Sequence, residues 1–389
     1  MVASRPEPGG RSGGRPRLLL LTPDYPPSPG GIQVVSHRLA AALAGFETTV
    51  LAPASAGAAE FDAHSGVRTL RVASPGALPG PARIGLLNAA ALARASMLRP
   101  QLTLSMHIVM SPAAAAIARA TGARAVQYFH AEEIGARPRL AAFAASNATA
   151  SIVVSEYTAG LVREASARHG KQPGTLHVIG NGTDVPEDHA PFSDEPGRAT
   201  ILTVGRIEER YKGHDAMLRA LPLVLAKVPE AQWVVVGDGS LRPSLEALAK
   251  GLGVDHAVRF LGAVSDEERN LWLRRARLVA MPSRLPAGGF AGEGFGIVYL
   301  EAGAYGKPVV AGNVGGALDA VSDGETGLLV DPTDPLALAE AIVRLLRDSE
   351  LAGRLGANGR ANALAHTWPH VAERVEAVLL GALDRSKTG

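Results

Sequence analysis

The residue types that point most directly to chemistry lie in the stretch Glu293-Gly-Phe-Gly-Ile-Val-Tyr-Leu-Glu301. Gly294 and Gly296 let the backbone come close to a ligand, and the apolar run from Phe295 to Tyr305 predicts a buried helix. The free N–H groups at the start of such a helix suit a phosphate. A carboxylate at each end then suits a ligand with hydroxyls on both sides of a diphosphate, such as a sugar nucleotide.

The two carboxylates also have a second interpretation, which needs no ligand. Glu301 is expected on the same helix face as Ile297, where an unpaired carboxylate would be costly to bury. It therefore needs a polar partner. That partner could be an arginine, with Glu293 solvated, and the stretch on its own fits both interpretations.

A pair of cations follows the strand expected at residues 199–204. Gly205 and Arg206 come directly after that strand, and Lys212 comes six residues after Arg206. Gly205 permits close backbone approach, and the two cations would lie beside the ligand of the Glu293 helix. Together with a helix N-terminus they can neutralise a diphosphate leaving group without a metal. The alternative is that both are exposed basic loop residues.

Candidate ligand contacts also occur at other strand ends. Gly30 and Gly31 close the loop after an expected strand at 18–22, at the point where a ligand would approach, although a plain turn also needs such glycines. His130 follows a strand expected at 125–129 and precedes two glutamates, so it is either a catalytic or a structural histidine. Gly237, in the turn after a third strand, could offer backbone groups to a nucleobase.

Alternating strand-like and helical segments must position these residues. Short apolar runs separated by Ala/Leu-rich helical stretches predict an α/β protein with two doubly wound, Rossmann-like parallel-sheet domains in series. We assign a disordered basic tail (1–16), a first domain (17–184), a Pro- and acid-rich linker (185–198) and a second domain (199–367). The expected strands are 18–22, 48–52, 67–72, 102–106, 125–129, 151–155, 199–204, 232–236, 258–261, 278–281 and 308–311.

Composition excludes several classes of protein. The 389 residues are 47% hydrophobic, enough for two cores, yet no run of eighteen apolar residues predicts a membrane span. Cysteine is absent, which fits a cytoplasmic enzyme. Residues 1–17 carry +3 of the net charge of +2, so the remainder is close to neutral and is not expected to bind nucleic acid. Arginine-rich segments at 83–99 and 119–139 are compatible with peripheral contact with an anionic membrane face or with solvated helix surfaces.

Taken together, these motifs resemble the retaining glycosyltransferases of the GT-B fold, in the family-4 group, and within it the phosphatidylinositol-mannoside-type mannosyltransferases. The resemblance covers nearly everything after the tail. The motifs that carry it are Pro29-Gly-Gly-Ile-Gln33, Phe129-His130 with Glu133-Ile-Gly135, Val154-Ser-Glu-Tyr-Thr158, Ile179-Gly-Asn-Gly182, Val204-Gly-Arg206 with Lys212-Gly213, Val236-Gly-Asp-Gly239, Glu293–Glu301 and Val309-Val-Ala-Gly-Asn-Val-Gly-Gly316.

The resemblance implies a role for each candidate residue. Glu301 would hold the ribose hydroxyls, Glu293 a hydroxyl of the donor sugar, and the amides of Phe295–Ile297 the diphosphate. Arg206 and Lys212 would stabilise the diphosphate as it departs. Gly31 would approach it from the first domain, and His130 would lie at the reacting centre. The donor would be GDP-mannose or a UDP-sugar.

The resemblance further implies the reaction and its setting. A hexosyl group would move to a hydroxyl of a small molecule or a lipid headgroup, by front-face attack with retention, without a bound metal or other cofactor. The two domains would face a central cleft, with the acceptor on the side of the first domain and the nucleotide sugar bound by the second. The final segment, 368–389, would return to the first domain. The enzyme would be cytoplasmic, with peripheral contact at the inner membrane face.

Two departures from the family pattern bear on this expectation. The spacer between Arg206 and Lys212 is slightly longer than in many relatives, which affects the reach of Lys212. Ala131-Glu132 stands where lipid-mannosylating relatives often have Gly-His, so the acceptor of this chain could differ from theirs. The alternative functions are a sugar-nucleotide epimerase or phosphorylase on the same scaffold, and a non-catalytic nucleotide-binding module.

Overall fold

Strands and helices alternate along the whole chain in the computed structural model, which describes residues 14–74, 78–187, 199–286 and 292–384. The elements of the first half are β1 (Arg17–Leu21), α1 (Gly31–Ala42), β2 (Glu47–Pro53), α2 (Ala58–Ser65), β3 (Arg68–Val72), α3 (Gly80–Leu98), β4 (Leu102–Ser105), η1 (Ile108–Met110), α4 (Ser111–Thr121), β5 (Arg124–Phe129), α5 (Glu132–Ala136), α6 (Pro138–Asn147), β6 (Ala150–Val153), α7 (Glu156–Arg168) and β7 (Leu176–Val178).

The second half repeats this alternation. Its elements are β8 (Ala199–Val204), η2 (Arg210–Lys212), α8 (His214–Leu225), β9 (Ala231–Val236), α9 (Arg242–Gly251), η3 (Asp255–Ala257), β10 (Val258–Gly262), α10 (Asp266–Arg275), β11 (Leu278–Met281), α11 (Ile297–Ala304), β12 (Val309–Gly312), α12 (Ala317–Ala320), β13 (Gly327–Val330), α13 (Pro335–Arg347), α14 (Ser349–Ala365) and α15 (Trp368–Asp384).

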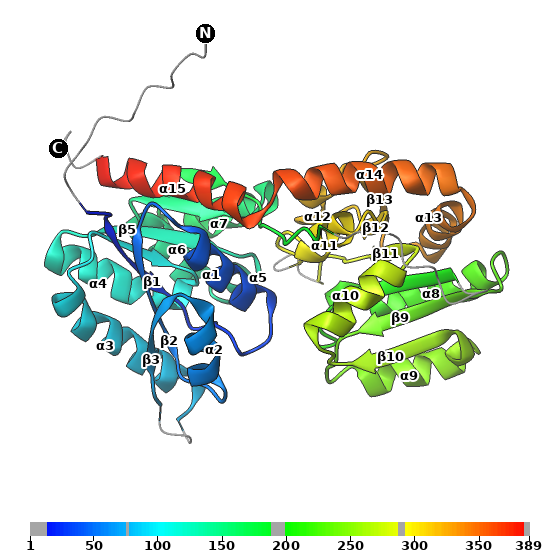
Figure 1. Ribbon diagram of the computed structural model, residues 1–389, viewed down its shortest axis with the longest axis horizontal. Coiled ribbons are helices and arrows are strands. Elements are labelled where there is room, and N and C mark those ends of the chain that lie inside the picture. The colour runs from blue at the N-terminus through cyan, green and yellow to red at the C-terminus, as the bar shows by residue number, and fades with distance from the viewer. Residues whose placement is uncertain (1–13, 75–77, 188–198, 287–291, 385–389) are drawn as a thin grey trace, which may run out of the picture.

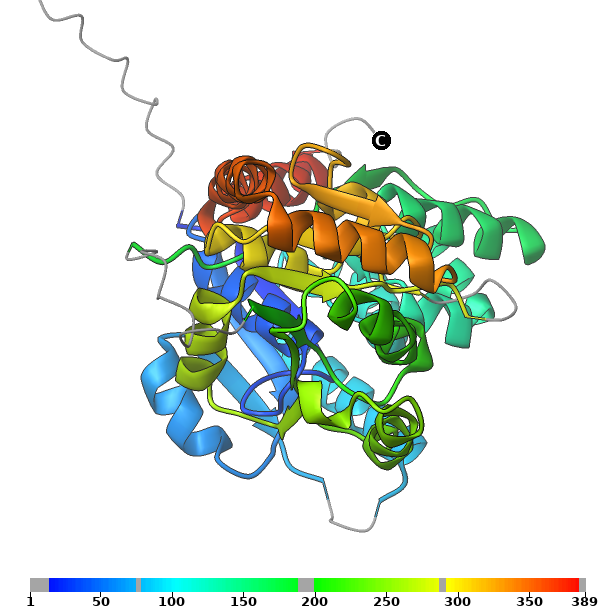
Figure 2. The same ribbon diagram turned by 90° about the vertical axis from the view of Figure 1, so that its right-hand side faces the viewer.

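The strands form two parallel sheets that lie side by side (Figure 1). Within the described residues the first sheet has 7 strands in the order β3-β2-β1-β4-β5-β6-β7, and the second has 6 in the order β10-β9-β8-β11-β12-β13. Figure 2 turns the second half towards the viewer, with α13 and α14 in orange above the green segments. The predicted fold of two doubly wound α/β units is confirmed.

The burial of the central strands explains their continuous apolar sequences. Residues Leu18–Leu21 of β1 are at most 1% exposed, as expected for a parallel strand covered on both faces. Most predicted strand bounds agree within two residues. The sequence interpretation did not identify β13, α13 or α14.

One predicted pair of helix boundaries was wrong. The helix expected over 295–305 runs from Ile297 to Ala304. Gly296 has a φ of 89°, in the left-handed region, so regular helix dihedrals begin only at the next residue.

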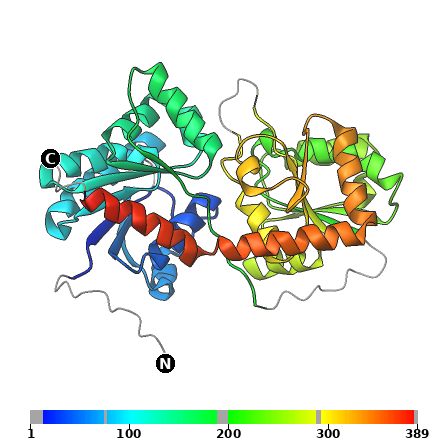
Figure 3. The same ribbon diagram turned by 90° about the horizontal axis from the view of Figure 1, so that it is seen from above.

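The C-terminal helices connect the two halves. In Figure 3, α14 and α15 follow each other along one side of the molecule, from the second sheet to the first. Helix α15 packs against α1, and Arg374 donates to the carbonyl of Val178 at 3.0 Å. Of the linker predicted at 185–198, residues 188–198 lie outside the described part of the chain, as do residues 1–13 of the predicted tail.

Candidate active site

The start of helix α11 is fixed by a close contact between two glycine-containing loops. Gly316 donates its N–H to the carbonyl of Glu293 at 2.8 Å. A Cβ atom on Gly316 would lie 2.0 Å from the carbonyl oxygen of Gly294, so only glycine fits there. The loop after β12 therefore sets the backbone that leads into α11, whose first N–H groups have no acceptor within the helix. Residues 287–291 of the Gly-rich segment before it lie outside the described residues.

Lys212 and Glu293 form an ion pair at this helix start. The Lys212 Nζ lies 3.2 Å from the Glu293 Oε2, and the two side chains are only 13% and 15% exposed. The ammonium also lies 5.3 Å from the centroid of the Tyr211 ring, a cation–π distance. Glu293 is therefore not solvated, and the longer spacer before Lys212 still brings its ammonium to the start of α11.

Arg206 lies nearby on the loop after β8 and pairs with a different carboxylate, that of Glu209. Its Nη2 lies 2.7 Å from the Glu209 Oε1, and its side chain is 59% exposed. Burial raises the pKa of the Glu209 carboxyl, against the opposing effect of Arg206. Arg206 thus presents a partly neutralised but accessible guanidinium beside the Lys212–Glu293 pair.

Gly205 and Gly237 pack against each other. A Cβ atom on Gly237 would lie 2.0 Å from the carbonyl oxygen of Gly205, which already makes glycine necessary at position 237 without any ligand. A Cβ on Gly205 would meet the Lys212 side chain at 3.4 Å. The two glycines therefore shape the ends of β8 and β9, and their proposed donor contacts remain predictions.

Glu301 has the arginine partner that the alternative interpretation required. Arg269 on α10 places its Nη1 3.6 Å from the Glu301 Oε1, where the glutamate side chain is 23% exposed. Burial raises the pKa of the Glu301 carboxyl, and the Arg269 charge opposes that shift. The distance is long for a hydrogen bond, so Glu301 keeps the capacity to accept further hydrogen bonds.

His130 lies at the carboxyl end of β5 as predicted, and it is a neutral, buried imidazole. Burial lowers the pKa of His130 to about 3. Its Nε2 lies 3.0 Å from the carbonyl oxygen of Met106, which can only accept, so Nε2 carries the proton and Nδ1 is an acceptor. The backbone N–H of His130 donates to the Glu133 Oε1 at 2.8 Å. Burial raises the pKa of Glu133 to about 8, so this carboxyl is mostly protonated at neutral pH.

The first half contributes further contacts to the start of α11. A Cβ on Gly31 would meet only the Ile297 Cδ1, at 3.8 Å, so the two loops face each other closely. The Ser155 hydroxyl donates to the carbonyl of Gly294 at 2.6 Å. The ring of Phe295 packs on Gly180, where a Cβ would lie 2.8 Å from it.

The structure therefore brings together residues that are far apart in the sequence. Lys212, Glu293 and Arg206 lie on neighbouring loops of the second sheet, and the Arg206 charge acts on Asp24 of the first. The sequence interpretation missed Arg269, Glu209 and Asp24. The serine that caps α7, Ser155, was part of a recognised motif, but its contact with Gly294 could not be read from sequence spacing.

Metal-ligating clusters and membrane-spanning helices are both absent from the described residues. They contain no group of three or more His, Cys, Asp or Glu side chains that could hold a metal ion. None of the helices in the described part of the chain is long and apolar enough to cross a membrane.

Comparison with known proteins gives two family matches. Residues 184–362 match the model described as glycosyl transferases group 1, and residues 29–187 match the glycosyltransferase family 4 model. The chain is 35% identical over 390 residues to the GDP-mannose-dependent alpha-(1-6)-phosphatidylinositol monomannoside mannosyltransferase of Mycolicibacterium smegmatis, covering 94% of this chain and 98% of that relative. The corresponding Mycobacterium tuberculosis enzyme is 32% identical over 398 residues, with the same coverage.

Solved structures share the fold. Anabaena Alr3699/HepE in complex with UDP and glucose superposes with a TM-score of 0.74 at 21% identity, covering 93% of this chain and 99% of that one. Sucrose-phosphate synthase from Thermosynechococcus elongatus gives a TM-score of 0.75 at 23% identity, with coverage of 94% and 98%. At these identities the similarity concerns the fold alone.

Proposed function

The chain belongs to the group 1 and family 4 glycosyltransferases with the GT-B fold, and on that premise we propose that it transfers mannose from GDP-mannose to a neutral hydroxyl acceptor with retention of configuration. The observation that carries the proposal is the sheltered Lys212–Glu293 pair at the start of α11. The two full-length relatives are named as GDP-mannose-dependent enzymes at 32% and 35% identity. This supports GDP-mannose over a UDP-sugar, since the UDP-bound neighbour is only 21% identical.

The donor diphosphate binds at the first N–H groups of α11, between Lys212 and Arg206. In the reaction the bond from the sugar C1 to the phosphate oxygen breaks, and the acceptor oxygen bonds to C1 on the same face. The acceptor proton passes to the departing phosphate oxygen. Lys212 and Arg206 stabilise the charge that develops on the diphosphate. Glu293, already oriented by Lys212, accepts a hydrogen bond from a sugar hydroxyl, and Glu301 accepts hydrogen bonds from the ribose.

His130 supports this geometry as a hydrogen-bond acceptor. Because Nε2 donates to Met106, Nδ1 is left to accept from a hydroxyl of the donor sugar or the acceptor. An imidazole whose pKa lies near 3 stays neutral throughout the physiological range. We therefore assign His130 an orienting role at the reacting centre, not that of a general acid.

The acceptor binds against the first sheet, opposite the donor groups. Two carboxyls lie on that side, those of Glu132 and of Asp24 in the loop after β1. Burial raises the pKa of the Asp24 carboxyl, the Arg206 charge opposes that shift, and the charge of Glu132 adds to it. Their negative potential disfavours an anionic group close to the reacting hydroxyl. This supports a neutral polyol ring, such as mannose or inositol, as the part of the acceptor that enters the cleft, with any phosphate lying outside it.

A lipid acceptor would require contact with a membrane surface, and α3 is the face that we propose for it. Met97 is 78% exposed and Leu92 is 41% exposed on this helix, alongside its arginines. Co-sedimentation with phosphatidylinositol-containing vesicles, compared with Met97→Glu, tests this contact. Equal sedimentation of both proteins would contradict it.

The central experiment is a donor-by-acceptor screen read by mass spectrometry. GDP-mannose, UDP-glucose and UDP-galactose are each combined with phosphatidylinositol monomannoside micelles, octyl α-mannoside, inorganic phosphate, or no acceptor. We expect a mannosylated product with GDP-mannose and an axial C1 linkage by NMR. Product without acceptor would indicate an epimerase, product only with added phosphate a phosphorylase, and tight GDP binding without product a binding module.

A further inference from the structure

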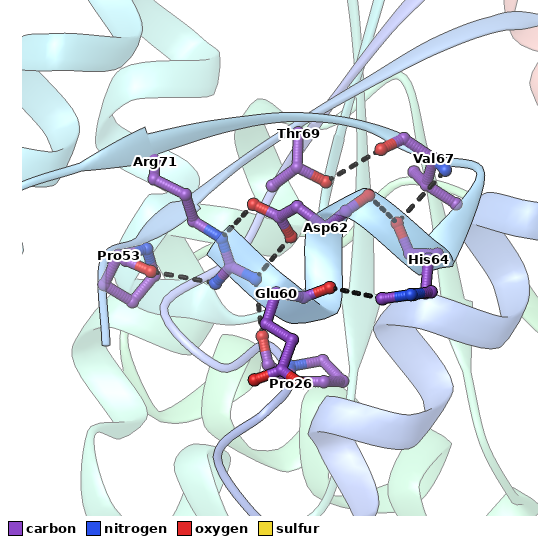
Figure 4. Close-up of polar contacts among 9 residues, drawn as sticks. Pro26, Pro53, Glu60, Asp62, His64, Val67, Thr69 and Arg71 are labelled. Atoms are coloured by element: carbon purple, nitrogen blue, oxygen red, sulfur yellow. Dashed lines mark hydrogen bonds and ion pairs between the residues drawn. The ribbon is translucent and has the colours of Figure 1, made fainter. Parts of the chain in front are cut away.

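Arg71, on β3, makes a set of contacts that the chemistry above does not use (Figure 4). Its Nε and Nη2 donate to the two carboxylate oxygens of Asp62 at 3.0 and 2.8 Å, a bidentate ion pair. Its Nη1 donates to the carbonyl of Pro53 at 3.0 Å, and Nη2 donates also to the carbonyl of Pro26 at 2.6 Å. The arginine side chain is only 13% exposed.

The guanidinium thereby joins four separate segments. Asp62 lies on α2, Pro53 ends β2, and Pro26 lies in the loop between β1 and α1, while Arg71 itself is on the edge strand β3. Its carbon Cζ also lies 5.1 Å from the centroid of the Tyr25 ring. The planar fork of an arginine can serve a carboxylate and two carbonyls at once, which the single ammonium of a lysine cannot reproduce.

The loop held by Arg71 faces the start of α11 from the side of the first sheet. We refer to residues 22–31 as the β1 loop. It carries Asp24, whose carboxyl is influenced by the charge of Arg206 across the cleft. It ends at Gly31, which faces Ile297 at the start of α11. A displacement at Pro26 therefore moves groups that face the reacting centre, although Arg71 itself does not reach it.

Aromatic packing beneath the loop holds it at Tyr25. The Tyr25 ring is 2% exposed and makes edge contacts with His37 and Phe61, at centroid distances of 5.8 and 6.2 Å. These ring contacts fix Tyr25, whereas the hydrogen bond from Arg71 fixes the backbone one residue further on. A sheltered ion pair adds little net stability over a well-packed apolar pair, so its distinguishing contribution is geometric.

We propose that Arg71, clamped by Asp62, is a positioning residue that holds the β1 loop as the acceptor-side wall of the cleft. The inference rests on the proposed function in one respect, namely that the acceptor binds beside this loop. It assigns Arg71 no contact with either substrate. Losing the clamp should weaken acceptor use and change nucleotide binding little, because the proposed donor contacts belong to the second sheet apart from those of Gly30 and Gly31.

The experiment compares three variants of the full chain. Arg71→Lys keeps the charge but loses the fork, and the double variant Arg71→Met/Asp62→Leu removes both charges while keeping apolar volume. Arg68→Met is the matched control, since Arg68 lies on the same strand, is 59% exposed and pairs only loosely with Glu47 at 3.8 Å. Each is measured for KM towards octyl α-mannoside, GDP affinity by titration calorimetry, and hydrogen exchange by mass spectrometry.

For both Arg71 variants we expect at least a tenfold rise in acceptor KM, GDP affinity within twofold of the unmodified chain, and faster amide exchange in peptides covering 22–34. Arg68→Met should match the unmodified chain in all three. Unchanged acceptor KM and unchanged exchange over 22–34 in a folded double variant would overturn the inference, as would an equal loss of GDP affinity. If the unmodified chain transfers no sugar, the proposed function fails, and the exchange measurement alone decides whether Arg71 positions the loop.

Discussion

Lys212 offers the sharpest test of the proposed chemistry, because its removal should affect catalysis and folding by separable amounts. Lys212→Met removes one preorganised cation from the departing diphosphate, a loss of about 2.7–4 kcal/mol, or about 10²- to 10³-fold in kcat. It also leaves the Glu293 carboxylate, only 15% exposed, without its cation. An uncompensated sheltered charge of this kind costs about 3–5 kcal/mol of folding stability.

The double variant Lys212→Met/Glu293→Gln separates the two effects. Removing both charges should recover most of the stability measured by urea unfolding, while the rate of mannosyl transfer stays low. Lys250→Met, at an exposed lysine in the last turn of α9, is the control for a lost positive charge. The reasoning would be refuted if Lys212→Met kept more than a tenth of the original kcat, or if the double variant recovered activity together with stability.

Three further predictions concern other parts of the site. Because the pKa of Glu133 is raised to about 8, the folded state binds more protons than the unfolded chain from about pH 4.5 to 8. The free energy of unfolding should therefore fall as the pH rises through this range, by up to about 1.4 kcal/mol per pH unit. Urea unfolding of Glu133→Gln should lack this pH-dependent contribution. Gly316→Ala would place a Cβ 2.0 Å from the Gly294 carbonyl oxygen and so displace the start of α11. We expect at least a tenfold loss of GDP affinity by calorimetry, and an unchanged affinity would contradict our account of this loop. Glu301→Gln should reduce the preference for GDP over 2′-deoxy-GDP by about tenfold to hundredfold, the worth of a hydrogen bond to a charged group; an unaltered ratio would place the ribose elsewhere.

The fold could be predicted because most strands in each half are short, continuous apolar runs in the sequence. Parallel strands buried on both faces need such runs, and Leu18–Leu21 illustrates this with exposures of at most 1%. The helix boundaries were less accurate, because a glycine such as Gly296 can extend an apolar run without adopting helical dihedrals. Strand β13 was missed because it is short and begins with glycine.

The positions of the candidate site residues could be predicted, whereas their contacts could not. Spacing after strands places Arg206, Lys212 and His130 beyond the carboxyl ends of strands, where ligand sites in such sheets lie. The partners of these residues depend on tertiary distances that no spacing encodes. Arg269 lies 32 positions before Glu301, and nothing in its own helix distinguishes it from the arginines that follow.

Residues at the start of α11 make contacts with both halves of the molecule. Glu293 pairs with a lysine of the second half, while the next carbonyl, that of Gly294, accepts from the Ser155 hydroxyl of the first at 2.6 Å. Such a hydrogen bond is worth only about 0.5–1.5 kcal/mol net, so it can be broken and re-formed in each turnover. We therefore expect closure of the two halves to complete the proposed donor site at little energetic cost, as a site that must admit one substrate and release another requires.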